Sequence, residues 1–272
     1  MNELTDQEYI RIRDYIKRNF GIHLGDEKKS LVYSRLRSIL MEKEFHSFSE
    51  YFDYLTRDAS GEAMIQFINR VTTNHTFFMR ETNHFDFFRD TALPEIAERH
   101  QARKDLRLWC AGCSSGEESY TLEIIIQEFF KTRRQIWDTK ILATDISTDA
   151  LKKAAQGVYP NESLQTLPRH WRSEYFQKVD ENNSVVTESV RNQILYRKFN
   201  LMAESFPFKH QMQVIFCRNV MIYFDNETRD QLVDKFYHLM EPGGYLFVGH
   251  SESLNRSGTK YRYVMPAVYR KE

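Results

Sequence analysis

The chain has 272 residues, of which 41% are apolar and 28% charged, as in a globular protein with one or two domains. Its 38 basic residues balance its 38 acidic residues, so no overall field draws it to nucleic acid or anionic lipid, and we expect neither partner. No apolar run is long enough to span a bilayer, and residues 1–6 lack the features of a secretory signal. We therefore expect a cytoplasmic protein without membrane insertion.

Residues 1–70 are predicted to form a helical domain, because apolar residues recur at helical spacing in four stretches. Gly21 is expected to end the first helix, Asp26 to cap the second, and Ser47 or Ser49 to begin the third. The expected apolar faces are Leu4, Ile10, Ile12, Tyr15, Ile16 and Phe20; then Leu31, Val32, Leu36, Ile39 and Leu40; then Tyr51, Phe52 and Leu55; and finally Met64, Ile65, Phe67, Ile68 and Val71.

From Leu106 onward, apolar runs of strand length alternate with helical patterns, which indicates βαβ units and a mostly parallel sheet. The predicted strand and helix pairs are 106–111 with 117–130, 140–145 with 148–156, and 214–218 with 227–240; a strand at 244–249 and a closing hairpin within 261–270 follow. We assign residues 91–272 to this α/β domain and residues 71–90 to a connector that lines its cleft.

One segment interrupts the alternation. Residues 175–179, 184–187 and 193–199 have the pattern of short half-buried strands, and residues 180–183 that of a hairpin turn. We therefore expect a small antiparallel β subdomain inserted at about residues 160–200.

The cysteines and histidines predict no metal site. Cys110 and Cys113 form a lone C-x-x-C pair, and Cys217 has no partner at a zinc-binding spacing. We favour two small residues that close a buried strand, with a thioredoxin-like redox pair as the alternative. The nine histidines, which include His75, His84, His170 and His250, show no metal-ligand spacing.

The ends of the predicted strands indicate a ligand site, because open α/β sheets bind ligands beyond the carboxyl ends of their strands. Asp145 ends the second strand, where an acidic residue typically accepts hydrogen bonds from ribose hydroxyls. The alternative is a carboxylate that caps the following helix, although Ser147 or Thr148 would cap it equally well.

The turn at residues 112–116 leads into a helix that begins with Glu117 and Glu118. A pyrophosphate at this helix start would face two negative charges, whereas a cationic ligand with a ribose would be favoured. S-adenosylmethionine fits, because its sulfonium and ammonium groups are positive. The alternative is that the two carboxylates only complement the helix macrodipole.

The segment from Val71 to Arg80 combines hydrogen-bonding groups (Asn74, Thr76), aromatic residues (Phe77, Phe78) and one cation. Such a connector either lines a cleft between domains or forms an amphipathic linker helix whose phenylalanines belong to the core. The pattern alone leaves both interpretations open.

Several stretches together resemble the CheR-type methyltransferases, which methylate glutamates of chemotaxis receptors with S-adenosylmethionine. The matching stretches are residues 72–80, 111–120, 143–146, 200–201, 215–225 and 243–252, in the order of the family. The run at 216–225 is highly specific, and the stretches span most of the chain. The resemblance implies a Rossmann-like class I methyltransferase domain with an antiparallel β insertion, preceded by an all-α domain.

The resemblance also implies roles for individual residues. The implied cofactor-binding residues are Asn74, Thr76, Arg80, Glu118, Asp145, Asn200, Leu201, Arg218 and Asn219. Asp145 matches the acid that binds the ribose, and Asn200 and Leu201 resemble the pair that flanks the adenine. Arg80 and Tyr223 are the implied catalytic residues, because Tyr223 matches a tyrosine near the transferred methyl group. Glu117 is a weaker match.

Basic residues of the second helix are implied to dock the acidic methylation region of receptors. Lys28, Lys29, Arg35 and Arg37 follow one another without an acidic residue between them, and an ordinary solvated helix face is the alternative. Ser38 and Ile39 occupy places that are often arginine in the family, which implies a weaker or differently arranged docking surface. Ser119 stands where the family usually has proline, which we expect to change little.

The implied activity is methyl transfer from S-adenosylmethionine to glutamate carboxylates of methyl-accepting chemotaxis receptors, with S-adenosylhomocysteine as the product. The expected partner is the cytoplasmic helical region of the receptor, and the expected oligomeric state is a monomer. Two alternatives are a non-catalytic module that binds S-adenosylmethionine or a nucleotide, and a methyltransferase of a non-receptor protein. A nucleic-acid methyltransferase is disfavoured, because the N/D-P-P-Y/F motif and a basic face are missing.

Overall fold

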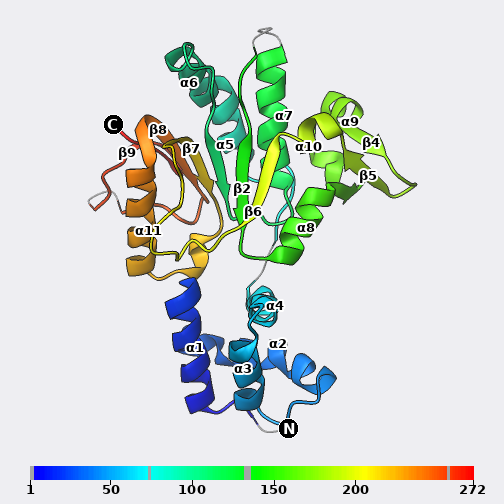
Figure 1. Cartoon of the computed structure of the whole chain (residues 1–272), viewed down its shortest axis with the longest axis vertical. Coiled ribbons are helices and arrows are strands. Elements are labelled where there is room, and N and C mark those ends of the chain that lie inside the picture. The colour runs from blue at the N-terminus through cyan, green and yellow to red at the C-terminus, as the bar shows by residue number, and fades with distance from the viewer. Residues whose placement is uncertain (1–2, 73–74, 132–135, 256–257) are drawn as a thin grey trace. The chain divides into compact units, whose positions relative to one another are not determined.

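A computed structural model describes residues 3–72, 75–131, 136–255 and 258–272. The chain divides into two compact units (Figure 1). The helical unit comprises Met1–His75, Asn200–Glu204 and Tyr223–Arg229. The sheet unit comprises Thr76–Phe199, Ser205–Ile222 and Asp230–Glu272. Within the described residues, no helix combines the length and the apolar character that crossing a membrane requires.

The four helices predicted for the first 70 residues are confirmed. They are α1 (Asp6–Phe20), α2 (Lys29–Glu42), α3 (Phe48–Arg57) and α4 (Glu62–Val71). Gly21 ends α1 with a φ of +72°, a left-handed conformation that glycine adopts readily. The Ser47 hydroxyl caps α3 by accepting a hydrogen bond from the backbone N–H of Glu50 at 3.1 Å.

Three details of the predicted helical domain were wrong. Asp26 does not cap α2, because its carboxylate pairs with Arg13 at 3.0 Å and a 3-10 turn (Asp26–Lys28) separates it from the helix. Ile10 is exposed, because Tyr9 takes the core-facing position in this turn of α1. The Tyr9 hydroxyl donates to the carbonyl of Gly25 at 2.6 Å. Leu31 is likewise exposed, while the other four residues of its predicted face are buried.

The sheet unit is built on a seven-stranded sheet in the order β6-β2-β1-β7-β8-β10-β9. Its strands are β1 (Leu108–Ala111), β2 (Ile141–Asp145), β6 (Ile194–Lys198), β7 (Met212–Cys217), β8 (Met240–Val248), β9 (Arg262–Met265) and β10 (Val268–Arg270). The first five pair in parallel, and β10 pairs antiparallel with both β8 and β9. The predicted parallel sheet and its closing hairpin are therefore confirmed.

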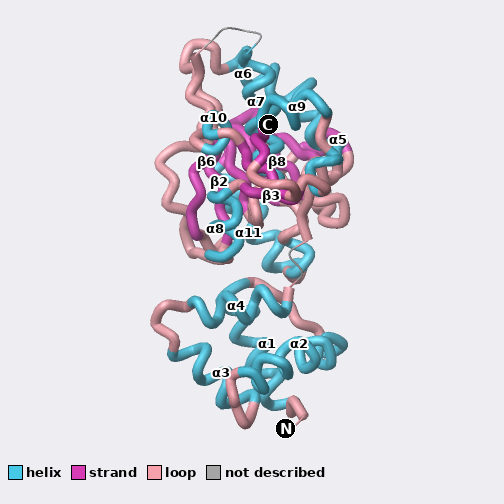
Figure 2. Tube along the Cα trace, turned by 90° about the vertical axis from the view of Figure 1, so that its right-hand side faces the viewer, coloured by secondary structure: helices cyan, strands magenta, loops and turns pink. Residues whose placement is uncertain are grey.

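Helices lie outside these strands, as Figure 2 shows. They are α5 (Thr82–Phe87), α6 (Leu93–Arg99), α7 (Glu117–Lys131), α8 (Thr148–Gln156), α9 (Arg169–Tyr175), α10 (Glu188–Arg191) and α11 (Asn226–Leu239). A π-helical turn (Phe88–Ala92) joins α5 to α6, and 3-10 turns form at Ser163–Thr166 and Met221–Tyr223.

Aromatic packing on both faces of the sheet holds these helices. On one face, Phe216 of β7 stacks on Phe247 of β8 with ring centroids 4.1 Å apart, and Phe85 of α5 stacks on Phe216 at 6.2 Å. On the other face, Trp109 of β1 meets Phe236 of α11 edge to face at 5.4 Å. Because side chains alternate along a strand, each strand contributes side chains to the packing on both faces of the sheet. The sheet is therefore buried on both sides, as expected of a parallel sheet.

The inserted antiparallel sheet exists, but one of its strands was assigned wrongly. It consists of β3 (Val158–Pro160), β5 (Asn183–Val186) and β4 (Phe176–Lys178) in that order. The segment predicted as its third strand is β6, which instead pairs in parallel with β2 in the large sheet, with Ile194 opposite Ile141. Strand β3 was not predicted, because it has only three residues and ends in a proline, which sheets tolerate on an edge strand.

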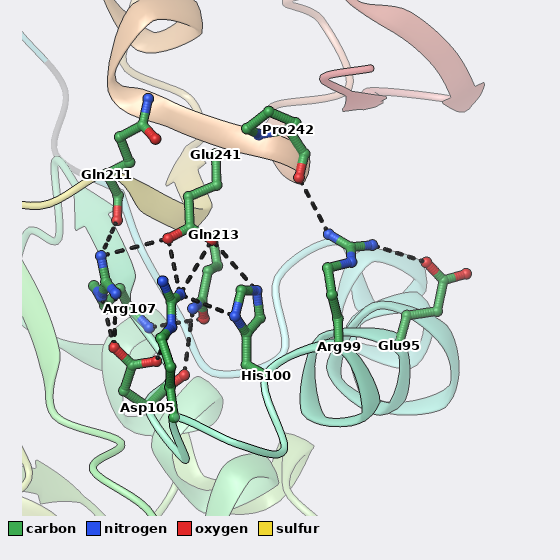
Figure 3. A network of polar contacts seen from close by, with 10 residues as sticks. Glu95, Arg99, His100, Asp105, Arg107, Gln211, Gln213, Glu241 and Pro242 are labelled. Carbon is green, nitrogen blue, oxygen red and sulfur yellow. Dashed lines mark hydrogen bonds and ion pairs between the residues drawn. The ribbon is translucent and has the colours of Figure 1, made fainter.

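A polar network ties together the amino ends of the central strands (Figure 3). Arg107 pairs with Asp105 at 2.7 Å just before β1, and Arg103 pairs with Glu241 of β8 at 2.9 Å. His100, at the end of α6, lies 3.3 Å from the carboxylate of Glu241. We call His100, Arg103, Asp105, Arg107 and Glu241 the amino-end network.

Candidate functional site

The turn between β1 and α7 packs tightly against the next strand. The backbone N–H groups of Gly112 and Cys113 both donate to the carbonyl of Thr144, at 2.8 and 2.9 Å. Gly116 has a φ of +100°, and a Cβ there would lie 2.9 Å from the Tyr159 hydroxyl oxygen, so only glycine fits. The same hydroxyl donates to the carbonyl of Ser115. The small residues of this turn thus allow a close backbone approach at the strand ends.

Asp145, at the end of β2, bridges two loops. Its Oδ2 accepts a hydrogen bond from the N–H of Ser114 at 2.8 Å, and its Oδ1 accepts one from the N–H of Ser147 at 2.9 Å. Burial raises the pKa of Asp145, and these backbone hydrogen bonds oppose that rise. Ser147 itself caps α8 through the N–H of Ala150, so the cap does not require Asp145. A carboxylate has about four lone-pair sites, so capacity to accept from a ligand hydroxyl remains.

Arg218, which follows β7, is a buried guanidinium held by two carboxylates. Its side chain is 1% exposed; it lies 2.8 Å from Glu118 of α7 and 3.0 Å from Glu81. The guanidinium also lies over the ring of Phe85, 5.1 Å from its centroid. An ion pair this buried becomes costly when one partner is removed, so the three charges act as a unit.

Glu81 is a member of this group that the sequence analysis missed. Besides Arg218, it accepts hydrogen bonds from the Asn219 side-chain amide at 3.2 Å and from the backbone N–H of His250 at 3.3 Å. Burial would raise the pKa of Glu81, but the charge and hydrogen bonds of Arg218 more than offset burial and hold it below its usual value. Its only sequence signal was its place beside Arg80. We call Glu81, Glu118, Arg218 and Asn219 the carboxyl-end network.

Glu252 is a second missed carboxylate, and it fixes the loops that follow β7 and β8. It is 2% exposed and accepts hydrogen bonds from the N–H groups of Gly249 at 2.6 Å, Asn219 at 2.7 Å and Ile222 at 2.9 Å. These bonds hold Asn219 at a φ of +59°, which non-glycine residues seldom adopt. Glu252 therefore positions Asn219, and through it the carboxyl-end network.

The connector contributes three of the predicted site residues, Asn74, Thr76 and Arg80. Thr76 and Arg80 are partly buried in the sheet unit, and the Arg80 guanidinium lies 6.0 Å from the centroid of the Phe77 ring. The carbonyl of Arg80 accepts a hydrogen bond from Arg218, which ties the connector to the carboxyl-end network. Asn74 lies outside the described residues.

Three further predicted site residues belong to the helical unit. The Asn200 side chain donates to the carbonyl of Asn19 at 2.8 Å, and Leu201 is buried. The carbonyl of Tyr223 accepts a hydrogen bond from the N–H of His23 at 2.7 Å. That Asn200, Leu201 and Tyr223 share one site with Glu118 and Asp145 stays a prediction.

The cysteines support packing over redox chemistry. Cys110, Cys113 and Cys217 are all buried and free. The thiol of Cys110 donates to Glu118 at 3.1 Å, and burial followed by the charge of Glu118 raises the pKa of Cys110 well above its usual value. A thiol held protonated in this way is a poor nucleophile.

The four predicted docking residues differ in their surroundings. Arg35 donates to the carbonyls of Arg70 at 3.1 Å and Val71 at 2.6 Å, and so caps the carboxyl end of α4. Lys29 pairs with Asp6 at 2.6 Å, and Lys28 is partly buried in the turn before α2. Arg37 is exposed. Arg35 therefore has a structural task, and Arg37 is the better placed for a partner.

Negative charge exceeds positive charge at the carboxyl ends of the strands. The carboxylates of Glu81, Glu117, Glu118 and Asp145 lie on the loops and helix starts there. The cations at the same ends are Arg80, Arg218 and Lys198, which ends β6 opposite Asp145. An anionic pyrophosphate would be repelled, whereas a cationic ligand with hydroxyl groups would be favoured. The donor set thus fits S-adenosylmethionine, which the sequence analysis suggested.

Comparisons with known proteins agree with this chemistry. Residues 74–269 match the family model "CheR methyltransferase, SAM binding domain", and residues 7–72 match "CheR methyltransferase, all-alpha domain". A chemotaxis protein methyltransferase of Borreliella burgdorferi is 40% identical over 98% of this chain and 95% of its own length. Chemotaxis protein methyltransferase 2 of Vibrio cholerae is 37% identical over 94% of this chain and 89% of its own length.

The chemotaxis protein methyltransferase of Escherichia coli is also similar, with 33% identity over 98% of this chain and 91% of its own length. The matches cover both predicted domains, and the family model names the cofactor that the strand-end charges favour. The resemblance found in the sequence is thereby confirmed. This chain belongs to the CheR family of S-adenosylmethionine-dependent methyltransferases.

Proposed function

We propose that this protein transfers a methyl group from S-adenosylmethionine to glutamate side chains in the cytoplasmic helical region of chemotaxis receptors, as a monomer in the cytoplasm. The observation that carries the proposal is the excess of carboxylates at the strand ends, in a chain that belongs to the CheR family. Asp145 offers acceptor oxygens for ribose hydroxyls, and Glu118 and Glu81 supply negative charge at the same edge of the sheet.

The cofactor supplies the difficult chemistry when bound, because its sulfonium activates the methyl carbon. The protein must therefore bind and orient rather than generate a reactive group. Arg218 fixes Glu118 and Glu81, and Glu252 fixes the Asn219 loop, so the binding groups are held before the ligand arrives. Such preorganisation lowers the cost of binding.

The acceptor glutamate has a pKa of about 4.3 and is already ionised at neutral pH, so no strong general base is required. Rate enhancement then comes mainly from aligning the carboxylate oxygen with the methyl group. We assign this alignment to Arg80 and Tyr223. Replacing Tyr223 with phenylalanine should lower turnover more than cofactor affinity, while Tyr54→Phe on the exposed face of α3 should change neither. Equal losses of turnover and affinity in Tyr223→Phe would contradict a role at the reacting centre.

Methyl transfer can be tested directly. Radiolabelled S-adenosylmethionine is mixed with the protein and receptor-containing membranes, and the label is then released with mild base. We expect base-labile label on the receptor, because carboxyl methyl esters hydrolyse readily. Cofactor binding without transfer to any protein would favour the non-catalytic alternative, and transfer only to other proteins would favour a non-receptor substrate.

Receptor docking is tested by charge reversal on α2. Arg37→Glu should lower receptor methylation about tenfold, since an acidic region would meet a like charge, while cofactor affinity stays unchanged. Arg57→Glu, at the end of α3, is the matched control for a change of two charges on the same unit. A similar loss in both variants would mean that net charge, and not docking through α2, controls the rate.

A further inference from the structure

Beside Arg218, Glu81 of the carboxyl-end network meets two histidines that the proposed function does not use. The histidines are His84 of α5 and His250, which follows β8, and one ligand atom of each of the three residues lies within 4.8 Å of the other two. His84 is completely buried, Glu81 is partly buried and His250 is exposed. The cluster is thus buried on the side of His84 and accessible to solvent on the side of His250. The sequence analysis missed it, because His250 lies far along the chain from the other two.

The contacts of His84 point to a missing partner. Its Nε2 lies 3.3 Å from the carbonyl oxygen of Pro266, and its Nδ1 lies 3.4 Å from Glu81 but has no hydrogen-bond partner among the residues that the structure describes. A neutral imidazole has one N–H, so it can donate to only one of these two acceptors. The completely buried His84 ring faces the same Glu81 oxygen as the Arg218 guanidinium, and a second positive charge in this position is disfavoured, which favours the neutral ring. One nitrogen lone pair therefore faces an oxygen acceptor unless a cation lies between them.

The arrangement matches the way histidines bind metals. A metal-ligating histidine usually donates its second ring nitrogen to a backbone carbonyl, as His84 can do toward Pro266. The ring of His250 lies 4.7 Å from that of His84, centroid to centroid, and nearly perpendicular to it. Two imidazoles and one carboxylate are a familiar zinc ligand set with a fourth position open to water.

We propose that Glu81, His84 and His250 form a binding site for a zinc-class transition-metal ion that shares Glu81 with the carboxyl-end network. The site has a consequence for the cofactor, and this part rests on the proposed function. Arg218 lies 3.0 Å from the same Glu81 oxygen that faces His84, so a divalent ion there competes with Arg218 for Glu81. Metal binding should therefore weaken the ion pair between Arg218 and Glu81 and lower the affinity for S-adenosylmethionine.

Metal binding is tested first, without the cofactor. The full chain is titrated with Zn²⁺ by calorimetry and with Co²⁺ by visible absorption, which reports the geometry and the kind of ligand. We expect one ion per chain with nitrogen and oxygen ligands. Absence of binding, or a thiolate charge-transfer band that shows binding through the cysteines, would overturn the proposal.

Variants then locate the ion. His250→Ala is the main variant, because this residue is exposed and its loss leaves the core intact; Glu81→Gln is the second. Each should weaken Zn²⁺ binding at least about tenfold, as loss of a ligand requires. The matched control is His238→Ala, an exposed histidine near Asp234 on α11. Wild-type Zn²⁺ affinity in His250→Ala would contradict the proposal that His250 is a ligand of the ion.

The link to the cofactor is measured separately. Saturating Zn²⁺ should lower the affinity of the wild-type protein for S-adenosylmethionine and leave that of His250→Ala unchanged. Equal affinity with and without Zn²⁺ in the wild type would refute the competition for Glu81. A wild-type protein that binds Zn²⁺ but no S-adenosylmethionine would instead refute the proposed function, so the two failures are distinguishable.

Discussion

The two ends of the central sheet carry networks of arginines and carboxylates, and the two networks differ in their balance of positive and negative charge. In the amino-end network, Arg103 and Arg107 face Asp105 and Glu241, and every charge has a partner within the protein. In the carboxyl-end network, the single guanidinium of Arg218 pairs with both Glu81 and Glu118, and Asp145 lies on the same edge of the sheet. A balanced network holds strands together, whereas an unbalanced one retains capacity for a cationic ligand. This contrast separates a structural cluster from a candidate binding site.

The difference between the two networks is tested most strongly by replacing one arginine in each. Arg218→Met should lower the free energy of unfolding by about 3–5 kcal/mol and abolish cofactor binding, because two partly buried carboxylates lose their buried guanidinium partner. Arg107→Met, whose side chain is 22% exposed, should cost about 1 kcal/mol and leave cofactor binding intact. Urea unfolding and calorimetry measure both quantities. Equal destabilisation by the two variants would remove the distinction between the two ends.

Glu123 is a buried carboxylate that pairs with no arginine among the described residues, and so differs from Glu81 and Glu118. It lies on α7, is fully buried, and accepts a hydrogen bond from Gln127 at 3.0 Å, while its Oε2 has no hydrogen-bond partner in the described part of the chain. Burial raises the pKa of Glu123 to about 8, from about 4.5 in the unfolded chain. The folded state therefore keeps a proton that the unfolded state releases, and stability falls as pH rises from about 4.5 to 8.

Replacing Glu123 with glutamine removes this titration. The stability gain over the wild type should be small near pH 5 and reach about 2–4 kcal/mol at pH 8 and above. Urea unfolding of both proteins across this pH range measures the difference. A gain that does not grow with pH would mean that Glu123 is ionised in the folded protein and is stabilised by other groups.

Asp145 tests whether the unbalanced end binds the cofactor through a carboxylate. Asp145→Asn should weaken S-adenosylmethionine binding by about 2 kcal/mol, since a charged acceptor becomes a neutral one. Asp149→Asn, on the exposed side of α8, is the matched control and should leave affinity unchanged. The two dissociation constants, compared by calorimetry, decide the point. Unchanged affinity in Asp145→Asn would leave Asp145 with only its loop-bridging role.

Glu241 at the amino end should show the smallest functional effect. Glu241→Gln weakens the contacts to Arg103, Arg107 and His100, and should cost about 1 kcal/mol of stability. Cofactor affinity and turnover should stay at wild-type levels. A loss of turnover without loss of stability would show that the amino-end network also serves function.

The sequence predicted the features that depend on local patterns. Helix faces follow the 3.6-residue period, and the parallel strands follow apolar runs between helices, so both were found. The sheet to which β6 belongs depends on a distant partner, Ile141 opposite Ile194, and no local pattern encodes that choice. Arg35 was expected at a partner surface for the same reason, because its bonds to the end of α4 arise only in the folded unit.

The candidate site shows the same limit. Asp145 and Glu118 stood out because they follow predicted strands, but Glu81 and Glu252 are single acidic residues whose partners come from other loops. Buried carboxylates that hold backbone N–H groups or arginines have no sequence signature of their own. Their roles emerge only once the strand ends are brought together.

The central claim is that the carboxyl ends of the strands select a phosphate-free cationic nucleoside. Calorimetry of the wild-type protein with S-adenosylmethionine, S-adenosylhomocysteine and NAD⁺ tests it most directly. We expect one molecule of each of the first two to bind per chain and no heat from the dinucleotide. Binding of NAD⁺ with higher affinity than S-adenosylmethionine, or no heat from S-adenosylmethionine at all, would contradict it.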